Sequence, residues 1–177
     1  MTSRAGGIVL RDAREGDLAA VRELTLRAYA EYAEVMTPSA WAGLEQAVRR
    51  TAESSDAERI VAEHEGRIVG SVMLFPPSTS TYGGSVEAPP WPELRLLAVS
   101  PDARGMGVGR LLVDECVRRA RASGATELGL HTSRSMETAI GMYRRMGFVR
   151  APDHDFHPDG AELVEGYRLP LDGRDPD

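Results

Sequence analysis

Short apolar runs and longer helix-like patterns alternate along this chain. The runs that predict strands cover residues 8–11, 59–64, 67–75, 94–99, 126–131, 148–150 and 163–169. Apolar residues at helical spacing predict helices over 18–34, over 39–54, from about 111 to 123, and around 139–146. The helix between strands 94–99 and 126–131 predicts a crossover connection, which makes these two strands a parallel pair.

Local signals refine these predictions. Ser39 can cap the second helix, and Ser133 or Ser135 can cap the last one. Strict alternation along the central strand places Glu93, Arg95 and Leu97 on one face.

Length and composition suit one domain over residues 1–177, with flexible tails at 1–7 and 172–177. The chain has 177 residues and is 42% hydrophobic, which is enough for a full core. We expect no membrane span and no export signal, and therefore a cytoplasmic protein. The single cysteine, Cys116, excludes an intramolecular disulfide. A net charge of −6 argues against nucleic acid as a partner.

A glycine-rich turn, Arg104-Gly105-Met106-Gly107-Val108-Gly109-Arg110, joins the central strand to the next helix. Alternating glycines let the backbone approach a ligand, and amides at a helix N-terminus favour negative charge. The turn therefore predicts a phosphate or pyrophosphate site. A P-loop is excluded because the chain has no lysine, and Arg110 stands where a dinucleotide fingerprint needs its third glycine.

Two motifs together carry a family resemblance. The first is R-x-x-G-x-G at Arg104, Gly107 and Gly109. The second runs from Met136 through Ala139 and Met142-Tyr143 to Gly147-Phe148. In this order and spacing the chain resembles the GCN5-related N-acetyltransferase (GNAT) family, although that family usually has Asn where Met136 stands.

The resemblance implies an α/β (α+β) fold with a mixed, mostly antiparallel sheet of about six or seven strands. About four helices would flank the sheet, which would open as a V between its two parallel central strands. The implied activity is transfer of an acetyl group from acetyl-CoA to a primary amine by direct attack in a ternary complex. Two alternatives remain open: a non-catalytic acyl-CoA-binding regulatory module, and an acetyltransferase acting on protein N-termini or lysines.

The resemblance also assigns site residues. Those implied to bind the cofactor are Leu97, Ala98, Val99, Arg104, Gly105, Met106, Gly107, Val108, Gly109, Arg110, Met136, Ala139 and Met142. Those predicted to face the acceptor are Tyr29, Tyr32, Trp91 and His131. The acceptor would be a small-molecule amine or a peptide, and a homodimer would be in keeping with the family.

Two residues are candidates for moving protons. Glu93 is a candidate general base, with an ordinary salt-bridged carboxylate as the alternative. Tyr143 is a candidate acid for the leaving thiolate, with a core aromatic as the alternative. The segment from His154 to Asp159 reads as a solvated loop, an acceptor wall or a weak metal-type cluster, and we expect no metal site.

Overall fold

A single mixed sheet forms the centre of the computed structural model, which describes residues 3–78, 88–157 and 162–171. The strand order is β1-β2-β3-β4-β5-β6-β8-β7, and all neighbours are antiparallel except the parallel pair β5 and β6. The strands are β1 Ser3–Ala5, β2 Ile8–Asp12, β3 Glu58–His64, β4 Arg67–Phe75, β5 Glu93–Val99, β6 Glu127–Ser133, β7 Val149–Arg150 and β8 Val164–Pro170.

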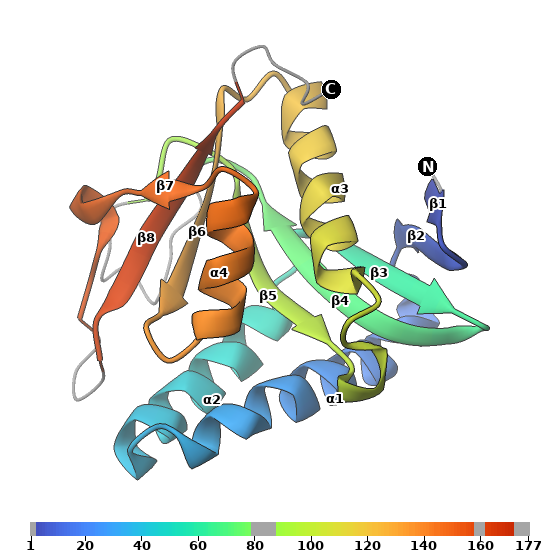
Figure 1. Cartoon of the computed structure of the whole chain (residues 1–177), viewed down its shortest axis with the longest axis horizontal. Coiled ribbons are helices and arrows are strands. Elements are labelled where there is room, and N and C mark those ends of the chain that lie inside the picture. Colours follow the sequence, from blue (N-terminus) through green and yellow to red (C-terminus); the bar gives the residue numbers. More distant parts are fainter. Residues whose placement is uncertain (1–2, 79–87, 158–161, 172–177) are drawn as a thin grey trace.

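Helices cover both faces of this sheet (Figure 1). Helices α1 and α2 lie on one face, and α3 and α4 lie on the other. The four helices are α1 Leu18–Tyr29, α2 Pro38–Ala52, α3 Val108–Ala122 and α4 Glu137–Arg145. Short 3-10 turns are η1 Glu15–Asp17, η2 Ala30–Glu34, η4 Pro101–Ala103 and η5 Pro152–His154. No helix in the described ranges is both long and apolar enough to cross a membrane.

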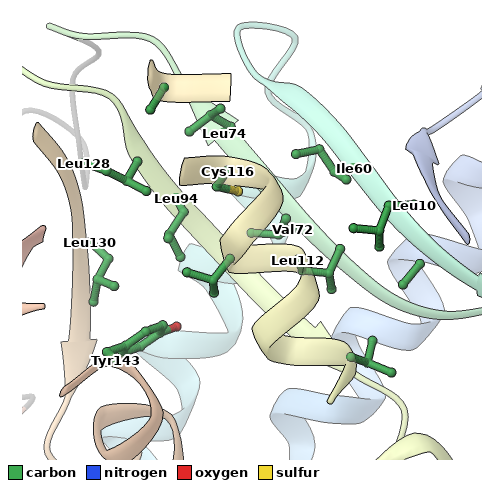
Figure 2. Packing of buried hydrophobic residues seen from close by; sticks show 14 of the residues in the cluster. Leu10, Ile60, Val72, Leu74, Leu94, Leu112, Cys116, Leu128, Leu130 and Tyr143 are labelled. Atoms are coloured by element: carbon green, nitrogen blue, oxygen red, sulfur yellow. The ribbon is translucent and has the colours of Figure 1, made fainter. Parts of the chain in front are cut away.

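The main core lies between the sheet and α3 (Figure 2). Leu112 and Cys116 of α3 are fully buried against β4 and β5. Gly70 of β4 allows this close approach, because a Cβ there would lie 2.6 Å from Cγ1 of Val108 and 3.0 Å from Cδ1 of Leu112. A glycine inside a strand thus lets the first turns of α3 pack directly on the sheet.

The two parallel strands separate almost as soon as they meet. Their one register pair among the described residues is Glu93 with Gly129, and the Gly129 N–H also donates to the Pro92 carbonyl at 2.9 Å. Beyond this vertex β5 continues along β4 while β6 continues along β8. The predicted V-shaped opening is therefore present, and the predicted fold class is confirmed.

A bulge corrects the predicted alternation along β5. Arg95 pairs with Met73 and Ala98 pairs with Ser71, so two residues of β5, Leu96 and Leu97, lie opposite the single residue Val72 of β4. Leu96 adopts a left-handed φ of 52°, which a non-glycine residue rarely does. Leu97 therefore does not share a face with Glu93 and Arg95, and instead packs against the core under α3.

Other details also differ from the sequence predictions. The first α-helix ends at Tyr29 and continues as the 3-10 turn η2, and Ser3–Ala5 form β1 within the expected N-terminal tail. Thr37, not Ser39, caps α2: its hydroxyl accepts from the Ala40 N–H at 3.3 Å. Pro38 then takes the first helical position, where a missing N–H costs nothing.

The last helix likewise lacks the predicted serine cap. Met136 stands at its N-cap, and the Ser135 hydroxyl instead donates to the Glu162 carboxylate at 2.8 Å. Residues 172–177, predicted as a tail, lie outside the described ranges.

We expect Gly70→Ala to destabilise the protein by about 1–3 kcal/mol, because the added methyl overpacks the contact between β4 and α3. Urea denaturation measures this change. Gly43→Ala in α2 is the matched control, since a Cβ there meets no atom within 4 Å and Ala favours helix. An equal effect of the two substitutions would contradict the close-approach argument.

Candidate active site

The glycine turn presents backbone amides at the start of α3. Gly105 and Gly107 have φ values of 79° and 76°, and a Cβ on either would meet no atom within 4 Å. The first intrahelical hydrogen bond runs from the Leu111 N–H to the Gly107 carbonyl at 3.0 Å. The N–H groups of residues 108–110 come before it and therefore have no acceptor within the helix. The first turn of α3 contains no acidic residue. The space around the glycines, the N–H groups at the start of α3 and the positive end of the helix dipole together suit a pyrophosphate.

Arg104, at the start of this turn, is exposed and forms an ion pair with Glu31 of η2 at 2.6 Å. A second, longer pair joins Arg27 of α1 to Asp102 at 3.5 Å. These contacts connect α1 and η2 to the glycine-rich turn and to Asp102, just before it. An anion bound at the turn would therefore compete with Glu31 for Arg104.

The remaining predicted cofactor residues surround the same region. Val108 is buried in the core, and Gly109 packs closely on Met142, where a Cβ would lie 3.4 Å from the sulfur. Arg110 is exposed, with Asp114 at 3.6 Å. Ala98 and Val99 pair with β4 on one side of β5.

A small cavity of about 60 Å³ lies where the strands part. Its walls come from the end of α1 and η2, from β5, from β6 and from α4. Seven residues that the sequence predicted for the site line it: Tyr29, Tyr32, Leu97, His131, Met136, Ala139 and Tyr143. Leu94, Arg95, Leu96, Leu130 and Thr132 complete the lining. Elements from both faces of the sheet thus meet at one point.

Glu93 lies at the vertex, behind the cavity wall, with a side chain only 2% exposed. One carboxylate oxygen is 2.9 Å from Nη2 of Arg95, and the other is 2.8 Å from Nδ1 of His131. Burial by itself raises the pKa of Glu93. The facing His131 and Arg95 lower this pKa by more than burial raises it, so the pKa of Glu93 lies below its ordinary value. Glu93 therefore stays ionised at neutral pH.

His131 bridges the two parted strands. Its Nε2 lies 2.8 Å from the His154 carbonyl oxygen, and its Nδ1 faces Glu93. Each ring nitrogen of His131 thus has an oxygen neighbour within 2.8 Å, one from β5 and one from the segment after β7. The cavity wall therefore includes His131 and Arg95, which both contact the buried Glu93 carboxylate. The Arg95 guanidinium also stacks over the Phe75 ring, 4.2 Å from its centroid.

Trp91 packs away from the cavity lining. Its ring lies 4.6 Å from the His154 ring, and it covers Gly129, where any Cβ would collide with the indole. The predicted acceptor residue Trp91 therefore holds the outer side of the vertex together with the segment after β7. Phe156 approaches the His131 ring edge-on at 5.5 Å.

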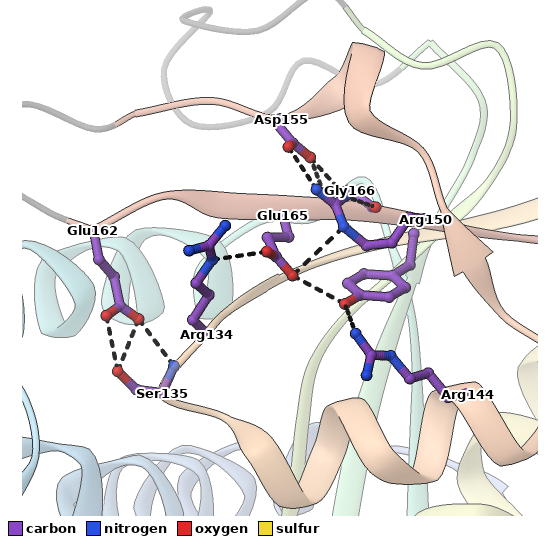
Figure 3. Close-up of polar contacts among 9 residues, drawn as sticks. Arg134, Ser135, Arg144, Arg150, Asp155, Glu162, Glu165 and Gly166 are labelled. Atoms are coloured by element: carbon purple, nitrogen blue, oxygen red, sulfur yellow. Dashed lines mark hydrogen bonds and ion pairs between the residues drawn. The ribbon is translucent and has the colours of Figure 1, made fainter.

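Polar contacts anchor that segment to β8 (Figure 3). Arg150 forms a two-pronged contact with Asp155 at 2.7 and 2.8 Å, and Asp155 also accepts from the Gly166 N–H at 2.9 Å. Asp159 lies outside the described residues. Within the described ranges no group of three His, Cys, Asp or Glu side chains is arranged to hold a metal ion.

Tyr143 of α4 is 5% exposed and lines the cavity. Figure 2 shows its ring beside Leu130, with the hydroxyl directed toward the space between β6 and α3. Burial raises the pKa of Tyr143, so the phenol keeps its proton at neutral pH. That state is the one a proton donor needs.

The sequence did not single out four residues that shape this site: Glu31, Gly70, Arg95 and Leu96. A glycine inside an apolar strand was a usable signal for Gly70, and a charge inside one was a usable signal for Arg95. The partner of Glu31 and the left-handed φ of Leu96 had no sequence signal, because both depend on tertiary contacts.

Comparison with known proteins identifies the class. The model of the acetyltransferase (GNAT) family matches residues 18–148. The chain therefore belongs to this family, and the predicted family and enzyme class are confirmed. Members of this family are acyltransferases that use acetyl-CoA, and this class applies to the chain.

The chain is also similar in sequence to acetyltransferases that are named for different acceptors. An IAA acetyltransferase from Azospirillum brasilense is 31% identical over 115 residues, covering 64% of this chain and 69% of the relative. An amino-acid acetyltransferase from Ralstonia nicotianae is 31% identical over 153 residues, covering 86% of this chain but only 31% of the relative. This chain thus spans less than a third of that second protein.

Solved structures share the fold. The PaiA N-acetyltransferase from Thermoplasma acidophilum, in complex with coenzyme A, has a TM-score of 0.66 at 16% identity, covering 92% of this chain and 98% of the other. A GNAT acetyltransferase from Brucella melitensis, in complex with acetyl-CoA, has a TM-score of 0.58 at 23% identity, covering 96% and 91%.

We expect Glu31→Gln to tighten acetyl-CoA binding by about 1.5- to 5-fold, because an exposed ion pair worth about 0.2–1 kcal/mol no longer competes for Arg104. Calorimetric titration measures the Kd. Glu34→Gln removes the same charge from the same 3-10 turn and is the control. Weaker binding in Glu31→Gln than in the control would contradict the competition.

We expect the stability that ionised Glu93 contributes to be full above about pH 4.5, the ordinary Glu value, and to be lost as pH falls through the lower folded-state pKa. The measurement is the free energy of unfolding of wild type and Glu93→Gln between pH 3 and pH 6. The gap between the two should shrink on acidification. Glu23→Gln, at an exposed position of α1, controls for general charge loss, and a gap that widened toward pH 3 would refute the assignment.

Proposed function

We propose that this chain transfers an acetyl group from acetyl-CoA to a primary amine by direct attack in a ternary complex. The observation that carries the proposal is the cavity at the parted strands, which is lined from both faces of the sheet, together with the open glycine turn at the start of α3. The donor can enter from the side of α3 and α4, while Tyr29 and Tyr32 face the opposite side, where an amine can enter.

The residues of the turn and of β5 would hold the donor. The amides from Gly105 to Arg110 bind the pyrophosphate, with Arg104 adding charge. Backbone groups of Leu97, Ala98 and Val99, on the edge of β5 that β6 leaves, would pair with the pantetheine arm of the donor. An N–H there would stabilise the thioester oxygen. Acetyl-CoA, when bound, supplies an acetyl group on a good leaving thiolate.

Two side chains would then handle protons. Tyr143 donates its hydroxyl proton to the departing thiolate as the new amide bond replaces the thioester bond. Glu93 is the proposed general base for the proton that the amine loses. Any such proton must pass through His131 or water, because Arg95 and His131 stand between Glu93 and the cavity.

The acceptor is proposed at the level of a small-molecule amine. A relative that is named an amino-acid acetyltransferase favours a small acceptor, and a protein of the same fold is the ribosomal-protein-S18-alanine N-acetyltransferase from Escherichia coli. A protein N-terminus or lysine is therefore the second candidate. A cytoplasmic location, a homodimer and the absence of a nucleic-acid partner stay predictions.

A free-thiol release assay with acetyl-CoA and a panel of amines tests the proposal. Thiol release that depends on one amine class supports it. Calorimetric binding of acetyl-CoA without turnover on any amine would favour the non-catalytic regulatory module. Mass spectrometry of peptides after incubation distinguishes the protein-acceptor candidate.

We expect Tyr143→Phe to lower kcat by roughly 100-fold, the scale of a lost proton donor, with the Kd for acetyl-CoA nearly unchanged. Steady-state kinetics and calorimetry measure the two quantities. Tyr167→Phe is the matched control, because it removes a buried hydroxyl of β8 that contacts Glu165 rather than the cavity. Unchanged turnover in Tyr143→Phe would remove the acid assignment.

A further inference from the structure

A second and larger cavity, of about 270 Å³, lies beneath α1. Its walls are the inner side of α1, the last turn of α2 and the middle of β3 and β4, and most of them are apolar. Cavities of roughly 300 Å³ and more are the ordinary size for small-molecule sites. This space is therefore close to the size that takes an organic group rather than a single water.

Both cavities are lined by residues on the same face of α1. Leu18, Val21 and Thr25 line the large cavity, and Tyr29 lines the small one. These four residues are spaced by three, four and four positions, which places them on one face of the helix. The large cavity thus continues the small one along the underside of α1.

Leu96 stands between them, since its side chain lines both cavities. It is the bulge residue of β5 with the left-handed φ of 52°. Such a conformation costs about 1 kcal/mol or more and persists only where the surroundings impose it. A half-buried leucine at the junction gives an apolar partition next to the reacting centre.

Five residues of the lining are polar or charged: Arg22 and Glu53 are exposed, and Thr25, Arg59 and Ser71 have polar neighbours. The Thr25 hydroxyl donates to the Val21 carbonyl at 2.8 Å and lies 3.5 Å from the Ser71 hydroxyl. Arg59 donates to the Ala52 and Ser54 carbonyls at 2.6 Å, so its charge caps the end of α2. Within this space an apolar ligand group would meet mainly hydrocarbon.

We propose that the cavity beneath α1 receives the apolar body of the acceptor, so that the preferred substrate is a primary amine carrying an alkyl or aryl tail. The amine nitrogen lies in the small cavity beside Tyr29, the tail passes Leu96, and the far end lies between α1 and β3. This inference rests on the proposed function and specifies its substrate class.

The test is a matched series of unbranched amines, from ethylamine to hexylamine and 4-phenylbutylamine, in the thiol release assay. The expected kcat/KM rises by roughly tenfold or more from the shortest to the best long amine, the discrimination that one to a few buried methylenes supply. Thr25→Phe fills the cavity and should reduce the preference for long amines by at least roughly tenfold while sparing ethylamine. Thr126→Phe, at an exposed position ahead of β6, is the control.

Ser71→Leu is a second filling variant from β4, and circular dichroism confirms that each variant folds. Equal kcat/KM across the series in wild type, or an unchanged preference in both folded filling variants, would overturn the inference while leaving acetyl transfer intact. Absence of thiol release with every amine, despite acetyl-CoA binding, would instead refute the proposed function. Calorimetric binding of hexylamine that Thr25→Phe abolishes would still support the cavity in that case.

Discussion

The whole site depends on one place where backbone pairing stops. Glu93 and Gly129 hold β5 and β6 together, and past them each strand keeps only its outer neighbour. Inner strands of a sheet normally satisfy both edges, because unpaired buried amides and carbonyls are costly. An edge left open in the centre of a sheet is therefore suited to a ligand that brings its own amide groups, and a pantetheine arm does so.

Three features maintain this opening. The Glu93–His131 pair links β5 to β6 at the vertex, and the Arg95 guanidinium compensates the buried carboxylate. Trp91 and the segment at His154 close the outer side of the same vertex. A buried ionic cluster of this kind adds little net stability but is strongly unfavourable to break. It therefore holds β5 and β6 at the separation that the proposed site requires.

Sequence patterns predicted the elements and the family because they depend on periodicity and on local glycine chemistry. The turn from Arg104 to Arg110 and the spacing to Tyr143 were readable for that reason. The left-handed conformation of Leu96 could not be predicted from the sequence, because it follows from a bulge in the pairing of β5 with β4. The pairing of Glu93 with His131 was equally hidden, since residues 38 positions apart meet only through the crossover. Sequence therefore predicted candidate site residues, whereas the contacts between them emerged only from the structure.

The most direct test of this account is the crystal structure of the protein with acetyl-CoA. The account predicts the pyrophosphate on the amides from Gly105 to Arg110, and the thioester beside Leu97 in the gap between β5 and β6. A nucleotide bound elsewhere, or β5 and β6 closed into a continuous ladder beyond Glu93 and Gly129, would contradict it.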